Sequence, residues 1–107
     1  MQKLIDYLKT RGLKESDYSY TRAGNLNFAI DGRQFQFSKT GYFRAKADRS
    51  KPRGAWKVRP FRNSPWSRHS LCGYQWYLVF KVTENGWGRC PTFTEDTLIE
   101  RLKHYNF

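Results

Sequence analysis

The sequence predicts an α+β domain in which a small antiparallel sheet of about five or six strands carries an N-terminal and a C-terminal helix packed on it. Three observations support this prediction. Apolar residues recur at helical spacing near both ends of the chain, and short alternating runs fill the region between them. The dipeptides Asp31-Gly32 and Asn85-Gly86 separate such runs and are typical of tight turns between antiparallel strands.

Length and composition favour one folded unit over residues 1–107. The chain has 107 residues, which is enough for a single compact domain and hardly for two. Aromatic residues make up 18% of it, whereas disordered chains lack large apolar side chains. No apolar run approaches the ~18 residues of a membrane helix, and no apolar run precedes Asp6 as in a secretory signal. We therefore expect a cytoplasmic protein without a membrane partner.

The first predicted element is a helix over residues 2–11. Leu4, Ile5 and Leu8 fall at helical spacing and define its apolar side. Gly12 is the residue type that commonly follows a helix end, and Leu13 would be the hydrophobic residue after that cap.

A strand over 18–22 and a turn at 23–25 lead into a hairpin over 26–37, the strongest local signal in the chain. A two-residue type I′ turn at Asp31-Gly32 pairs residues whose numbers sum to 63. That register places five apolar residues on one face: Leu26, Phe28, Ile30, Phe35 and Phe37. Because the turn and the binary pattern agree independently, the hairpin register is well defined.

The middle of the chain predicts two more strands and two irregular stretches. A turn over 38–41 precedes a strand over 42–46, and a polar basic loop follows over 48–54. A strand over 55–61 is limited to an edge or a strand end by Pro60. The stretch over 62–70 is expected to be irregular.

The longest apolar strand is predicted over 73–83, with Trp76 and Tyr77 on opposite faces. A type I′ turn at Asn85-Gly86 would pair residues whose numbers sum to 171, which places Leu78 beside Phe93. A final helix begins after Thr94, a favoured N-cap residue. Its apolar stripe is formed by Leu98, Ile99, Leu102 and Tyr105.

The two cysteines, Cys72 and Cys90, are expected to be reduced thiols. In the predicted hairpin Cys90 faces Lys81, which lies roughly 30 Å along a straight strand from Cys72. A disulfide needs Cα atoms closer than about 7 Å. Two cysteines with His69 and His104 also lack the tight ligand pairs of zinc sites. We expect no metal and no cofactor.

Positive charge is concentrated in residues 39–68. Ten Lys and Arg residues and one acid, Asp48, give this segment a charge of 10 − 1 = +9, out of +11 for the whole chain. A nucleic-acid backbone neutralises such a cluster, and unpaired bases stack on exposed aromatic rings. The predicted binding residues are Lys39, Tyr42, Arg44, Lys46, Arg49, Lys51, Arg53, Lys57, Arg59, Arg62, Trp66 and Arg68.

The sequence therefore predicts a small basic nucleic-acid-binding protein that contacts the phosphate backbone with strands and loops. It contains no helix-turn-helix, zinc-finger, RNP or GXXG pattern, so no recognition helix is expected, and DNA and RNA both stay open as the partner. Small size, many aromatic residues and the lack of a motif would suit an accessory protein of a phage or mobile element.

Two alternatives follow from the same residues. A metal-independent endoribonuclease would use His69 as the base, with Arg59 and Arg62 stabilising the phosphorane. The element layout is similar in outline to small bacterial ribonuclease toxins, although no motif aligns. A protein-binding inhibitor or adaptor would instead dock its basic surface on an acidic partner. A metal-dependent nuclease is disfavoured, because turns and helices account for the carboxylates other than Asp48, whose neighbours are cationic.

Overall fold

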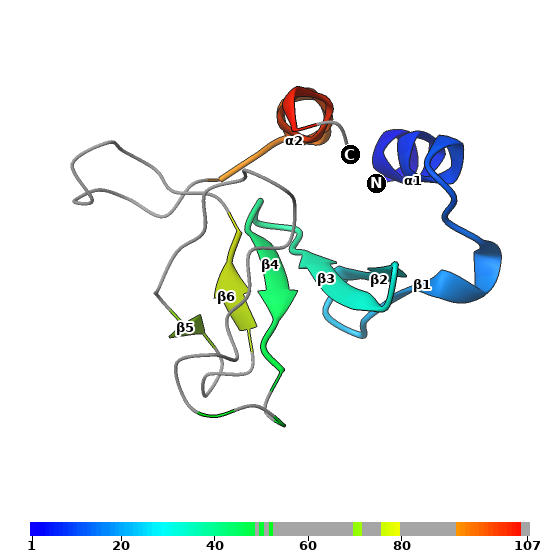
Figure 1. The fold of residues 1–107 in the computed structure, drawn as a ribbon. Helices are drawn as coiled ribbons and strands as arrows, with labels where there is room; N and C mark the ends of the chain where they lie inside the picture. The colour runs from blue at the N-terminus through cyan, green and yellow to red at the C-terminus, as the bar shows by residue number, and fades with distance from the viewer. Residues whose placement is uncertain (49, 51, 53–69, 72–75, 80–91, 106–107) are drawn as a thin grey trace.

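Both predicted helices and an antiparallel sheet are present in the computed structural model, which describes residues 1–48, 50, 52, 70–71, 76–79 and 92–105. Figure 1 shows the sheet with the two helices on one side of it. The sheet has the strand order β1-β2-β3-β4-β6-β5. In chain order the elements are α1 (Gln2–Thr10), the 3₁₀ helix η1 (Glu15–Asp17), β1 (Tyr18–Tyr20), β2 (Leu26–Ile30), β3 (Arg33–Phe37), β4 (Phe43–Lys46), β5 (Ser70–Leu71), β6 (Trp76–Leu78) and α2 (Glu95–His104).

The hairpin β2–β3 has the predicted register. Leu26 pairs with Phe37 and Phe28 with Phe35. The turn residues Asp31 and Gly32 have φ values of 52° and 76°, as a type I′ turn requires. The turn and the alternating apolar pattern therefore specify one pairing, as expected from the sequence.

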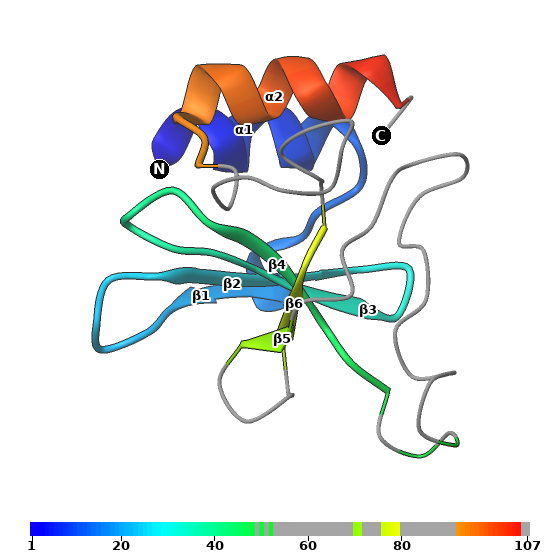
Figure 2. The ribbon, with the colours of Figure 1, turned by 90° about the vertical axis from the view of Figure 1, so that its left-hand side faces the viewer.

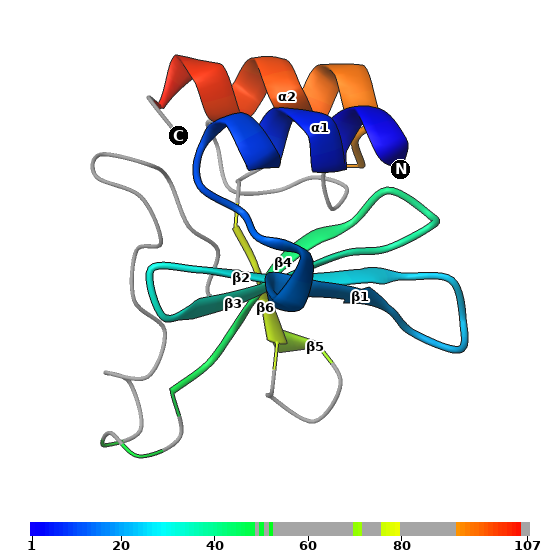
Figure 3. The same cartoon turned by 90° about the vertical axis from the view of Figure 1, so that its right-hand side faces the viewer.

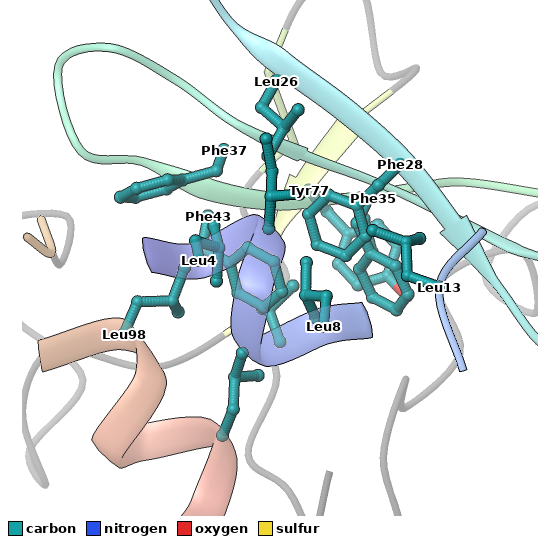
Figure 4. Packing of buried hydrophobic residues seen from close by; sticks show 14 of the residues in the cluster. Leu4, Leu8, Leu13, Leu26, Phe28, Phe35, Phe37, Phe43, Tyr77 and Leu98 are labelled. Carbon is teal, nitrogen blue, oxygen red and sulfur yellow. The ribbon is translucent and has the colours of Figure 1, made fainter. Parts of the chain in front are cut away.

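A stack of aromatic rings forms the centre of the core. The ring of Phe35 lies 5.4 Å from that of Phe28 and 5.6 Å from that of Phe43, centroid to centroid. Figure 4 shows these rings packed with Leu4 and Leu8 of α1 and with Leu98 of α2. Burial of a large apolar side chain contributes about 1.5–3 kcal/mol to folding. The sheet and the helices therefore stabilise each other through this layer.

Helix α1 ends in the glycine-based cap that the sequence predicts. The N–H of Gly12 donates to Lys9 O at 3.2 Å, and the N–H of Leu13 donates to Leu8 O at 3.0 Å. These are the two bonds of a Schellman motif. Leu13 is buried, so the cap also directs the chain from the helix into the core.

The two helices lie side by side and run in the same direction (Figures 2 and 3). Glu95, in the first turn of α2, accepts a hydrogen bond from the Leu4 N–H at 3.0 Å and lies 3.1 Å from the amino group of Met1. Lys3 pairs with Asp96 at 3.5 Å. The positive end of the α1 dipole is thus neutralised by the other helix, far away in the sequence.

The last two strands differ from the prediction. β6 lies between β4 and β5, and Leu78 pairs with Arg44. Phe93 lies outside the strands and donates its N–H to Gly41 O at 2.8 Å, so the predicted pairing of Leu78 with Phe93 is wrong. β5 occupies the end of a stretch expected to be irregular. The pairing of β4 with β6 joins segments far apart in the chain, which local periodicity does not specify.

Several predictions fall on residues outside the described part of the chain. They are the strand over 55–61, the turn at Asn85-Gly86, both cysteines and most of the strand over 73–83. Among the described residues, no helix has the length and hydropathy needed to cross a bilayer.

A first prediction concerns Gly41, which has a φ of 101° and lies against the segment leading into α2. An added Cβ would lie 2.8 Å from the carbonyl oxygen of Phe93. Gly41→Ala should lower the unfolding free energy by more than the roughly 1–2 kcal/mol that left-handed backbone costs a non-glycine residue. Urea unfolding measures this change. Gly12→Ala is the matched control, since its φ is 105° and no atom of the described residues outside its chain neighbours lies within 4 Å of an added Cβ. Equal losses in the two variants would contradict the prediction.

A second prediction tests the contact between the helices. Glu95→Gln removes the charge beside the N-terminus of α1 and should lower the unfolding free energy by about 1 kcal/mol. Glu100→Gln is the control, because Glu100 is an exposed residue of the same helix. Thermal unfolding of both variants at low salt measures the difference. A loss of the same size in Glu100→Gln would show that the charge acts without this contact.

A third prediction concerns the cluster that joins α1, η1 and β1. Lys9 Nζ donates to Glu15 Oε1 at 2.6 Å and the Tyr18 hydroxyl donates to Glu15 Oε2 at 2.8 Å. The hydrogen bond to Glu15 raises the pKa of Tyr18 above 10.0. This hydrogen bond therefore stabilises the fold below pH 10, and the stabilisation is lost as the pH rises through the folded-state pKa of Tyr18. Glu15→Gln should return the pKa of Tyr18 toward 10.0 in an NMR titration, and an unchanged value would contradict the contact.

Candidate nucleic-acid interface

The pairing of the strands separates their side chains into two faces. Phe43, Ala45 and Tyr77 are buried on the face that carries the helices. The residues that alternate with them lie on the opposite face, which we call the open face. From the register, its described members are Ser19, Asn27, Ala29, Gln34, Gln36, Arg44, Lys46 and Trp76. Tyr42, just before β4, also belongs to this face, because its ring lies against the Arg44 guanidinium.

A row of hydrogen-bonded polar side chains crosses the open face over β2, β3 and β4. Gln36 Nε2 donates to Asn27 Oδ1 at 2.9 Å, and Arg44 Nη1 donates to Gln36 Oε1 at 2.8 Å. Gln36 is only 8% exposed, so both ends of its amide are bonded where an unpaired polar group would be costly. The row holds the guanidinium of Arg44 in one orientation.

Arg44 keeps hydrogen-bonding capacity after this contact. Its Cζ lies 5.4 Å from the centre of the Tyr42 ring, so both side chains lie on the same side of the strand. Within the described part of the chain, its Nε is buried without a hydrogen-bond partner, and no described carboxylate pairs with it. Among the described residues, the positive charge of this guanidinium is therefore not neutralised by a carboxylate.

The structure describes four of the twelve predicted binding residues. Tyr42, Arg44 and Lys46 share one face, as the alternation of 42–46 predicts, and Lys46 is exposed. Lys39 lies in the turn between β3 and β4, where its N–H donates to Asn25 Oδ1 at 3.0 Å. The other eight lie outside the described residues: Arg49, Lys51, Arg53, Lys57, Arg59, Arg62, Trp66 and Arg68.

The charges of the described residues differ between the two layers. α1 and α2 together contain four basic and four acidic residues, so the helical layer is neutral. Three ion pairs between described residues join Met1 to Glu95, Lys3 to Asp96 and Lys9 to Glu15. The open face, as far as it is described, has two cations and no acid. Among the described residues, the open face therefore carries a net positive charge, whereas the charges within the two helices balance.

Two residues of this face were missed in the sequence. Trp76 lies directly opposite Lys46 on the neighbouring strand and is half-buried. The alternation of 73–83 separates it from Tyr77, but the sequence does not show which of the two faces the helices. Gln36 was missed because it alternates with Phe35 and Phe37, and a polar residue at such a position normally indicates exposure to solvent.

The residues predicted for chemistry, His69, Arg59 and Arg62, lie outside the described part of the chain. Within the described ranges, no group of three or more His, Cys, Asp or Glu residues is placed to hold a metal ion. Among the described carboxylates, Glu95 and Asp96 pair with groups at the start of α1, and Glu15 pairs with Lys9 at its end.

Comparison with known proteins adds no identity to this geometry. The chain matches no family model, no curated protein and no solved structure.

Proposed function

We propose that this protein binds nucleic acid and contacts the phosphate backbone with the strands and loops of residues 39–68. The proposal rests on the lack of carboxylate partners for the described basic residues of this segment. Lys39, Arg44 and Lys46, its three described cations, have no carboxylate partner among the described residues. Cations kept apart from the protein's own acids are available to an external polyanion.

Counterion release explains why phosphate contacts at this surface would be favourable. A nucleic acid carries condensed cations, and each Lys or Arg that neutralises a phosphate releases them into solution. Arg44 is already oriented by Gln36, so less side-chain entropy is lost when it binds. Lys46 is exposed and adds a mobile charge on the same strand.

The two alternatives from the sequence stay predictions. The ribonuclease hypothesis depends on His69, Arg59 and Arg62, and would be supported by RNA cleavage in EDTA that His69→Ala abolishes. The adaptor hypothesis requires an acidic protein partner and predicts no affinity for unrelated DNA or RNA. No described contact favours either of them over nucleic-acid binding.

A fourth prediction tests the proposal with salt. Binding to single-stranded and duplex DNA and RNA should weaken steeply between low and moderate salt. Lys46→Ala should reduce the slope of log affinity against log salt by about 0.7 to 0.9, the value of one phosphate contact. Fluorescence anisotropy at several salt concentrations measures it.

Lys14→Ala is the matched control for this experiment. Lys14 is an exposed lysine between α1 and η1, outside the open face, and its loss should leave the slope unchanged. Equal effects of the two substitutions would show that total charge matters and that the surface is misplaced. Absence of binding to every nucleic acid at low salt would overturn the proposed function.

A further inference from the structure

We infer that the open face binds single-stranded nucleic acid, with Tyr42 and Trp76 stacking on unpaired bases while Arg44 and Lys46 contact phosphates. This inference rests on the proposed function and narrows it to one class of nucleic acid. The inference rests on two aromatic rings that lie beside two cations. Arg44 and Lys46 are on β4, Trp76 is on the adjacent strand β6, and Tyr42 directly precedes β4.

The position of Trp76 follows from its neighbours. Tyr77 and Val79 are buried on the helical face, so the residue before them is directed to the open face. Trp76 is paired with Lys46 in the register of β4 and β6. A half-buried indole beside an exposed ammonium gives a ring for a base and a charge for the phosphate of the same strand.

Tyr42 provides the second ring. Its contact with the Arg44 guanidinium combines an aromatic surface with a fixed cation. Tyr42 lies four positions before Lys46, the partner of Trp76, and four positions extend roughly 13 Å along a strand. Stacked bases lie about 3.4 Å apart in a strand, so the two rings reach different nucleotides, and Arg44 lies between them.

The shape of the face favours a single strand over a duplex. The major groove of B-DNA is about 12 Å wide and admits a helix or a two-stranded ribbon. Four adjacent strands, β2, β3, β4 and β6, present the open face, and at ~4.8 Å spacing their axes already span roughly 14 Å without side chains. A broad sheet with rings and cations is suited to splayed, unpaired bases.

Charge complementarity determines the kind of occupant. The described open face carries Arg44 and Lys46 without an acid, whereas the helical layer is neutral. A neutral apolar partner would leave these cations desolvated and unpaired. An acidic protein would pair with the cations, but a polymer that supplies phosphates and aromatic bases in alternation satisfies both the cations and the rings. We therefore choose a nucleic acid rather than a protein.

The decisive experiment compares four probes of equal length at one salt concentration: single-stranded DNA, single-stranded RNA, duplex DNA and an abasic deoxyribose-phosphate chain. The abasic chain keeps the phosphates and lacks the rings. We expect tighter binding of the base-carrying single strands than of the duplex or the abasic chain. Trp76→Leu should weaken single-strand binding by about 5-fold to 150-fold and leave binding to the abasic chain unchanged.

Three further variants control this result. Tyr42→Leu should act like Trp76→Leu, while Trp76→Phe keeps a ring and should retain most of the affinity. Tyr20→Leu is the matched control, because Tyr20 is 52% exposed but its register with Leu26 places it on the helical face. It should change nothing. Thermal unfolding of each variant shows whether it is folded.

The outcomes separate this inference from the proposed function. If the wild type binds the abasic chain or the duplex as tightly as the base-carrying single strands, stacking is wrong while nucleic-acid binding stands. That comparison needs no variant, so a Trp76→Leu protein that fails to fold does not prevent a decision. If no probe binds at low salt, the proposed function itself fails.

Discussion

The structure depends on the burial of one sheet face beneath two helices. Phe28, Phe35 and Phe43 lie in one ring stack on that face, and α1 and α2 close over them. Because side chains alternate along a strand, burial of this set fixes every neighbouring residue on the other face. The side chain of Arg44 therefore lies on the open face because its neighbours Phe43 and Ala45 are packed in the core.

The polar row on the open face shows how a buried amide is accommodated in this sheet. Gln36 bonds to residues on both neighbouring strands, so the cost of burying it is offset by hydrogen bonds. A leucine at this position would keep the sheet intact and release Arg44. Gln36 thus contributes to the surface by restricting the rotation of the Arg44 side chain, which the strand alone leaves free.

Local signals in the sequence predicted the parts of the fold that local interactions determine. The hairpin could be predicted from the Asp31-Gly32 turn and the alternation of apolar residues. Both helices could be predicted from their capping residues and the helical spacing of their apolar residues. The pairing of β4 with β6 joins Arg44 to Leu78, and neither segment carries information about the other. In the candidate site, the shared face of residues 42–46 could be predicted from alternation. Trp76 could be assigned to that face only from the β4–β6 register, and Gln36 only from its hydrogen bonds to the two neighbouring strands.

The contact between the two helices also constrains how the chain is made. Glu95 accepts the N–H of Leu4 across 91 positions, and Leu98 and Leu102 complete the layer over the ring stack. During synthesis the first helix and the hairpin leave the ribosome before this partner exists. Their apolar surfaces stay uncovered until α2 emerges, and in this interval a nascent chain is most exposed to aggregation and to chaperones.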